Sequence, residues 1–299
     1  MTGYPEAGRG LMLSVMASTL FALMSAYAKL LAPLTGLDIF AWRVVWTAPG
    51  ALALIALRGR WPALVGLARR CARDWRLLIA LPVSAALLGV QLWLFLWAPL
   101  HGRMLEVSLG YFLLPLTMVL VGRFYYHERL DPLQWAAVAC AALGVAHEVW
   151  VTRAFAWPTL VVALGYPPYF VLRRRINADS LAAFAIEIAL LCPIALAMVA
   201  TSTTRVAGHP LLWAVLLPGL GILSTLALAS YLKASRMLPM ALFGILGYVE
   251  PVLLVVVSLL LLGETLSVAQ LVTYGPIWIA VALTAWHSAM LMRRLPARG

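Results

Sequence analysis

The sequence predicts an all-α membrane protein whose helices cross a lipid bilayer many times. Apolar residues (Ala, Val, Ile, Leu, Met, Phe, Trp, Tyr and Cys) make up 64% of its 299 residues, and charged residues make up only 11%. A soluble domain has about 45–50% apolar and about 25% charged residues. A soluble fold of this length would therefore lack a polar surface, and the same apolar content excludes a disordered chain.

Ten apolar runs have the length of a membrane crossing. A hydrocarbon core about 30 Å thick needs about 20 helical residues. The runs cover residues 10–31, 39–58, 77–98, 104–123, 132–149, 155–173, 181–200, 210–232, 240–262 and 268–292. They leave no length for a soluble domain. The first run is longer than the core of a signal peptide, so we expect it to stay as the first helix although Ala26-Tyr27-Ala28 resembles a cleavage site.

The basic residues predict the orientation. With the N-terminus in the cytoplasm, 17 of the 22 Lys and Arg residues fall on the inner side, three on the outer side and two (Lys29 and Arg43) in or near spans. Short positive loops resist translocation, so both termini are expected in the cytoplasm. The basic stretch Arg58–Arg76 is then a loop that signals orientation and can rest on anionic lipid, which argues against a nucleic-acid partner.

Two segments of the chain resemble each other. Leu109–Tyr111 matches Leu246–Tyr248, and four further residues recur 136 positions later: Pro115, Glu128, Leu130 and Gln134 match Pro251, Glu264, Leu266 and Gln270. The copies begin five spans apart, an odd number, so they face opposite ways. We therefore predict two inverted five-helix repeats, residues 1–150 and 151–299, around a central cavity, an architecture typical of secondary transporters.

Motifs for other chemistries are missing from the sequence. Cys71, Cys140 and Cys192 form no metal or disulfide pattern. The chain has no Walker A motif, no HExxH motif and no GxSxG motif. We therefore expect no ATP-driven pump, no recognisable enzyme and no cofactor or metal.

Several short motifs are spread along the chain: Gln91-Leu92-Trp93, Leu96-Trp97-Ala98, Glu106–Tyr111, Pro115, Glu128-Arg129-Leu130, Arg236–Pro239, Leu246-Gly247-Tyr248, Glu250-Pro251 and Gly263-Glu264. With these motifs the sequence resembles the drug/metabolite transporter superfamily, in particular its ten-helix EamA-type exporters and their RarD-like branch. The resemblance covers nearly the whole chain, with Gln91 standing where that branch is expected to have Asn. It implies a monomeric or homodimeric exporter of small metabolites in the bacterial inner membrane.

Polar and aromatic side chains within the spans are the candidates for substrate binding. Charges at membrane depth are costly and need a reason. Arg43 can bind a carboxylate, but an acid or a lipid phosphate would suit it equally, and Lys29 can equally be an interfacial anchor. The other candidates are Gln91, Trp93, Trp97, Tyr111, Tyr166, Tyr169, Tyr231, Tyr248 and Glu250. Packing or an interfacial belt is the alternative for each aromatic residue, whereas the pair Tyr166 and Tyr169 flanks two prolines that should kink or break the helix.

Three acids are candidates for coupling. Glu250 precedes Pro251, where the lost backbone donor loosens the helix, and ranks first. Glu187 lies among apolar neighbours in the middle of its span, where a buried structural pair is the alternative. Glu106 begins a helix, where a role at the N-terminal dipole is the alternative.

The leading hypothesis is therefore export of small zwitterionic metabolites, namely amino acids or derived compounds including opine-type metallophores, by alternating access. An amphipathic drug efflux permease is the alternative. A membrane assembly or signalling protein without transport is a third hypothesis, but the longest loop is short for that role.

Overall fold

The computed structural model describes residues 4–101, 103–153, 155–204, 210–261 and 268–293. Within these ranges all regular secondary structure is helical. The helices are α1 (Tyr4–Lys29), α2 (Gly36–Leu57), α3 (Trp61–Arg73), α4 (Trp75–Leu100), α5 (Met104–Phe124), α6 (Pro132–Thr152), α7 (Trp157–Arg175), α8 (Ser180–Thr201), α9 (Pro210–Met237), α10 (Met240–Leu246), α11 (Val249–Leu261) and α12 (Val268–Arg293).

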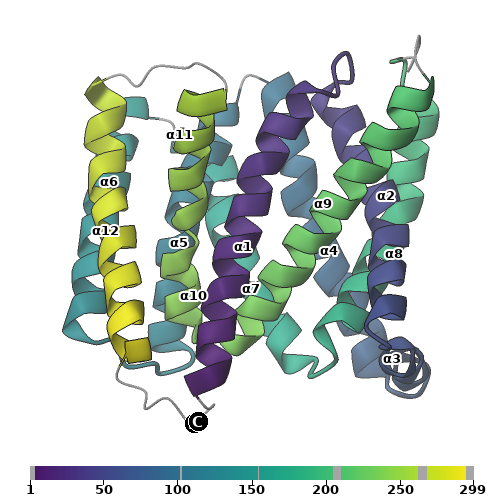
Figure 1. The fold of residues 1–299 in the computed structure, drawn as a ribbon, viewed down its shortest axis with the longest axis horizontal. Helices are drawn as coiled ribbons and strands as arrows, with labels where there is room; N and C mark the ends of the chain where they lie inside the picture. Colours follow the sequence, from purple (N-terminus) through teal and green to yellow (C-terminus); the bar gives the residue numbers. More distant parts are fainter. Residues whose placement is uncertain (1–3, 102, 154, 205–209, 262–267, 294–299) are drawn as a thin grey trace.

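Most helices stand side by side in one bundle, and α1 begins and α12 ends at the same end of it (Figure 1). Among the described residues, six helices have the length and hydropathy to cross a bilayer: α1, α2, α5, α6, α8 and α9. A seventh crossing is counted if the bent pair α3–α4 forms one span. The polytopic helical membrane class predicted from composition is confirmed.

Helix starts follow local sequence signals. The Thr35 hydroxyl accepts a hydrogen bond from the backbone N–H of Asp38, and the Asp38 carboxylate accepts one from the backbone N–H of Thr35. This reciprocal pair caps the N-terminus of α2. Asp131 and Gln134 form the same reciprocal cap before α6. Asp179 accepts two N–H groups at the start of α8. Gln134, one of the residues that recur in the second half of the chain, thus has a structural role.

The sequence predicts a loop for the basic stretch 58–76, but the structure has a helix within it. It contains α3, which is bent by 115° from the following helix segment Trp75–Gln91. Gly59 has a φ of 60°, a left-handed conformation that glycine adopts without strain, and it turns the chain from α2 into α3. Leu67 of α3 is buried against Leu77 and Leu81 of α4 and against the α7–α8 corner. This packing fixes α3 as a short helix lying across the end of the bundle.

The paired prolines do not break α7, which runs continuously from Trp157 to Arg175. Pro167 has no N–H for the carbonyl of Ala163, four residues earlier. The hydroxyl of Thr117 on α5 donates to that carbonyl instead, at 2.6 Å. The predicted break is therefore absent because a neighbouring helix satisfies the freed backbone group.

The break beside Glu250 is present. The run 240–262 is divided into α10 and α11 at Gly247 and Tyr248, one turn before Pro251. Pro251 stands in the first turn of α11, where a missing N–H costs little. The proline expected to loosen this helix thus lies at the start of its second piece.

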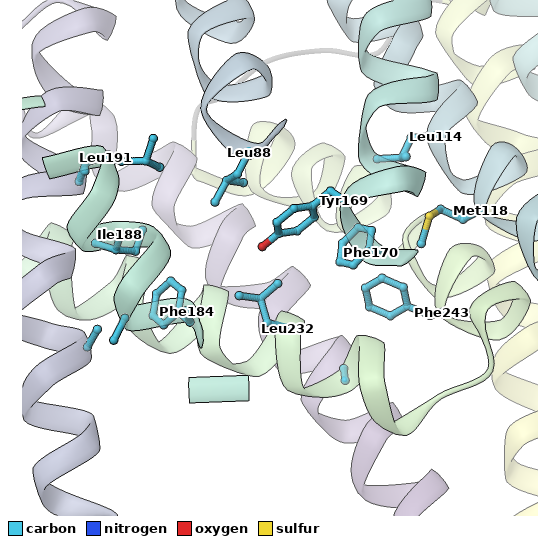
Figure 2. Packing of buried hydrophobic residues seen from close by; sticks show 14 of the residues in the cluster. Leu88, Leu114, Met118, Tyr169, Phe170, Phe184, Ile188, Leu191, Leu232 and Phe243 are labelled. Atoms are coloured by element: carbon cyan, nitrogen blue, oxygen red, sulfur yellow. The ribbon is translucent and has the colours of Figure 1, made fainter. Parts of the chain in front are cut away.

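The core lies between helices that are far apart in the sequence. α1 packs on α9, α2 on α8, α5 on α7 and α10, and α6 on α12. Figure 2 shows the central apolar cluster, with Phe170 of α7 facing Phe243 of α10. Their ring centres are 5.2 Å apart in an edge-to-face arrangement.

Candidate functional site

Arg43 is the basic side chain at the centre of the site. It lies about two turns into α2, and its Nε donates a hydrogen bond to the hydroxyl of Ser224 on α9 at 2.9 Å. The guanidinium carbon lies 6.0 Å from the centre of the Phe21 ring of α1. A cavity of about 10 Å³ adjoins it, lined by Phe40, Arg43, Val44, Thr47, Leu88, Ile188, Ser224 and Leu228. This cavity is far smaller than a metabolite.

Two tyrosines face each other beside Arg43. The side chains of Tyr111 on α5 and Tyr166 on α7 share a hydrogen bond, and their ring centres are 6.1 Å apart. Both lie within electrostatic range of Arg43. Tyr166 also stacks on Phe170, with ring centres 6.3 Å apart and planes at 23°. The structure therefore brings these two predicted residues together with Arg43.

Tyr231 of α9 completes an aromatic wall. Its ring contacts Phe21 of α1, Phe170 of α7 and Phe243 of α10, with centre-to-centre distances of 5.8, 5.7 and 4.7 Å. Helices from both halves of the chain thus supply rings to one cluster. Aromatic rings can bind the apolar part of a ligand or a cation.

Glu250 is the acid of this cluster. It lies in the first turn of α11, just after the break between α10 and α11. Its carboxylate lies within electrostatic range of Arg43, Tyr166 and Tyr231. Among the described residues no ion pair joins Glu250 to Arg43 or to another basic side chain. Arg43 and Glu250 therefore lie in the same part of the protein interior without forming a direct ion pair.

Glu187 is engaged in a buried structural pair, which was the alternative interpretation. Its carboxylate is 2.9 Å from Nη1 of Arg173, and the hydroxyls of Ser84 and Tyr169 donate to it at 2.5 and 3.3 Å. Arg173 also donates to the carbonyl of Ser180 at 3.0 Å. The predicted residue Tyr169 belongs to this network. The sequence did not predict the Arg173–Glu187 network, because Arg173 was assigned to an inner loop.

The predicted residues of α4 point in different directions. Gln91 is buried, its Nε2 donates to the carbonyl of Val161 at 2.9 Å, and its amide rests against Gly165 of α7. The amide oxygen of Gln91, Oε1, is buried and has no hydrogen-bond partner among the described residues. Trp93 is 50% exposed on the outside of the bundle. The side chain of Trp97 lies outside the described residues.

Three further candidates lie apart from the cluster. The Tyr248 hydroxyl donates to the carbonyl of Phe112 at 2.9 Å. Glu106 pairs with Arg103 at 2.9 Å in the first turn of α5. Lys29 is exposed in the last turn of α1. Their contacts are those of packing, helix-end and surface residues.

One polar connection was not predicted. The carboxylate of Glu128, in the turn between α5 and α6, accepts the backbone N–H groups of Met240 and Ala241 at 2.6 and 2.8 Å. Arg174 of α7 donates to the carbonyls of Ser235 and Leu238 beside it. These contacts fix the start of α10. The recurrence of Glu128 in the second half of the chain was the available signal, but it did not indicate the partner.

The described residues hold no group of three or more His, Cys, Asp and Glu side chains placed to bind a metal ion. The arrangement of Arg43, Glu250 and the aromatic rings suits non-covalent recognition of a small molecule that carries both charges.

Comparisons with known proteins identify the family. No protein-family model matches the chain. A Pseudomonas aeruginosa protein named chloramphenicol-sensitive protein RarD is 51% identical over 297 residues, which is 98% of this chain and 99% of that protein. An uncharacterized transporter of Haemophilus influenzae is 38% identical over 87% of both chains, and the Escherichia coli protein RarD is 28% identical over 293 residues.

A solved structure supports the fold. It covers 97% of this chain and 99% of its own with a TM-score of 0.71, at 19% identity. That identity supports a likeness of fold alone. The alignments with the three sequence relatives cover 87–98% of this chain, and these relatives are named as RarD or as a transporter. The chain therefore belongs to the RarD family of membrane transporters.

Proposed function

We propose that this protein is a bacterial inner-membrane secondary transporter that exports small zwitterionic metabolites by alternating access. In this proposal the ten predicted spans correspond to α1, α2, α4, α5 and α6 in the first half and α7, α8, α9, α10 with α11, and α12 in the second. Both termini face the cytoplasm, as the positive-inside distribution favours.

Helix packing supports two related halves. Exchanging the halves maps α1 onto α7, α2 onto α8, α4 onto α9, α5 onto α10 with α11, and α6 onto α12. The contacts α2–α8, α6–α12 and α5–α10 map onto themselves. The contact α1–α9 maps onto α4–α7, α5–α7 maps onto α1–α11, and α2–α9 maps onto α4–α8, and every one of these pairs packs together. An inverted repeat would produce this correspondence, and rocking of such halves is the usual basis of alternating access.

The observation that carries the substrate class is the separation of Arg43 from Glu250. A buried ion pair would normally form a short contact, as Arg173 and Glu187 do at 2.9 Å. Arg43 and Glu250 remain within electrostatic range without forming one. A zwitterion between them would place its carboxylate on Arg43 and its ammonium on Glu250. Tyr111, Tyr166 and Tyr231 would border its remaining part.

This structure then represents a closed state. The cavity beside Arg43 is about 10 Å³, so substrate entry needs a rearrangement of the surrounding helices. The break between α10 and α11 lies directly before Glu250 and gives that rearrangement a place to occur. Glu250 can also carry the coupling proton, because Glu106 and Glu187 are engaged with arginines.

The test is efflux of radiolabelled amino acids and opines from proteoliposomes that contain the purified protein. We expect saturable efflux of at least one zwitterion that is lost in the double variant R43Q/E250Q. The matched control is the variant R129Q, which removes an exposed charge away from the cluster. If no zwitterion moves, or if the double variant transports as well as R129Q, the proposal is wrong.

An amphipathic drug is the second candidate substrate class, because the wall of Phe21, Phe170, Tyr231 and Phe243 is largely apolar. The same proteoliposomes distinguish the two classes. Efflux of a neutral amphipathic drug that is unchanged in R43Q/E250Q, with no efflux of zwitterions, would favour this alternative.

A further inference from the structure

Helix α3 has an exposed apolar stripe that no other part of the described structure covers. Trp61 and Val65 are 46% and 43% exposed, and Ala68 and Ala72 follow on the same face with exposed side chains. The spacing i, i+4, i+7 and i+11 places these four residues in one line along the helix. Water is a poor environment for such a stripe, so its natural contact is an apolar phase.

Another side of α3, which carries Leu67, is packed against the protein. Leu67 is 3% exposed, and Ala63, Leu64 and Cys71 pack around it in the cluster shared with α4, α7 and α8. Arg60 pairs with Asp179 at 3.7 Å, and Arg70 donates to the carbonyl of Asn177. The stripe therefore cannot rotate into the bundle without breaking this packing.

A row of arginines borders the apolar stripe. Arg69 and Arg73 lie one turn apart on α3, and Arg76 follows in the first turn of α4 beside the 68% exposed Trp75. All three arginine side chains are exposed, and none forms an ion pair with an acid among the described residues. Two acids near α3 have other partners: Asp74 accepts the N–H of Arg76, and Asp179 pairs with Arg60 and caps α8.

We propose that α3 lies in the membrane–water interface of the inner leaflet and binds anionic phospholipid headgroups through Arg69, Arg73 and Arg76. The 115° bend between α3 and α4 turns α3 away from the direction of the spans, and Figure 1 shows α3 at the end of the bundle where α1 begins and α12 ends. The stripe of Trp61, Val65, Ala68 and Ala72 then contacts the acyl boundary while the arginines reach phosphates. This assignment rests on the proposed orientation and does not depend on the transported substrate.

The consequence for the transporter is a lipid contact on the corner that holds its buried ion pair. α3 packs on the residues between α7 and α8, and these two helices carry Arg173 and Glu187. Lipid bound at α3 would therefore stabilise the α7–α8 corner against movement.

The test is a titration of the detergent-purified protein with phosphatidylglycerol and, separately, with phosphatidylcholine, followed by native mass spectrometry. We expect phosphatidylglycerol to bind more tightly than phosphatidylcholine. The variant R69Q/R73Q/R76Q should weaken phosphatidylglycerol binding on the order of 100-fold. Each arginine near an anionic surface strengthens binding by a similar factor, and the three factors multiply. The control R9Q/R129Q/R153Q removes three exposed charges elsewhere and should keep the wild-type affinity.

Several outcomes would overturn the proposal. Equal binding of the two lipids, or equal loss in both triple variants, would mean that the arginines of α3 form only a solvated surface. Displacement of phosphatidylglycerol by sn-glycerol 3-phosphate at equal concentration would indicate a site for a free anion. Circular dichroism melting of each variant separates loss of binding from loss of folding. None of these readouts involves transport, so they are independent of the proposed substrate.

Discussion

The carboxylate of Glu128 accepts the backbone N–H of Ala241 at 2.8 Å, and so joins the turn after α5 to the first turn of α10. Gly122 makes this approach possible, because a Cβ at that position would lie 2.6 Å from the same nitrogen. The contact holds α10, the short helix before the break at Gly247. A side chain of the first half of the chain thus positions the helix that leads to Glu250.

Replacing Glu128 by Gln should destabilise the protein by about 1–3 kcal/mol, because a charged acceptor of two backbone donors becomes a neutral one. Thermal unfolding in detergent, followed by circular dichroism, measures this. The neighbouring variant R129Q removes an exposed charge and should unfold like the wild type. Equal stability of both variants would show that Glu128 contributes little to holding α10.

Removing one partner of the buried pair should be more costly. Either R173M or E187M leaves a single charge at a site where both side chains are at most 3% exposed, with an expected loss of about 3–5 kcal/mol. The double variant R173M/E187M should be more stable than either single variant, because no lone charge remains. Urea or heat unfolding of the three variants checks the order, and additive losses would contradict a direct pair.

The substrate proposal predicts different selectivities for two variants: R43Q should distinguish an acid from its amide, and E250Q should not. R43Q should raise the KM for a zwitterionic amino acid about 10–100-fold, but change it little for the corresponding amino-acid amide, which has no carboxylate. E250Q should impair both compounds, because both retain the ammonium group. Efflux kinetics from proteoliposomes measure the four values. A loss in R43Q that is equal for acid and amide would remove Arg43 from carboxylate recognition.

The contact between α6 and α12 predicts a difference between two glycines. A Cβ on Gly144 would lie 2.6 Å from the carbonyl oxygen of Thr273, whereas one on Gly66 of α3 would meet no atom within 4 Å. G144A should therefore force the helices apart at a cost of about 1–3 kcal/mol. G66A should be neutral or stabilising by up to about 1 kcal/mol, because alanine favours helix. Melting curves of both variants measure these changes in stability. Equal effects of the two substitutions would argue against close packing at Gly144.

The sequence by itself determined the membrane class and most helix positions. Long apolar runs have one low-energy solution in lipid, which is a helix that satisfies its own backbone hydrogen bonds. The caps at Thr35, Asp131 and Asp179 are equally local. The assignment of Arg43, Tyr111, Tyr166, Tyr231 and Glu250 to one site remains a prediction, although the structure brings these residues close together.

Only the tertiary structure decided which polar groups are partnered. Glu187 and Glu250 look alike in the sequence, as single acids in apolar helices, yet Arg173 reaches the first and no arginine pairs with the second among the described residues. Likewise Thr117, 46 residues from Ala163, keeps α7 unbroken at its prolines. Such pairings depend on distances between helices that are remote in the chain. Spacing along a sequence specifies the face of a helix on which a residue lies, but not the neighbour that this face meets.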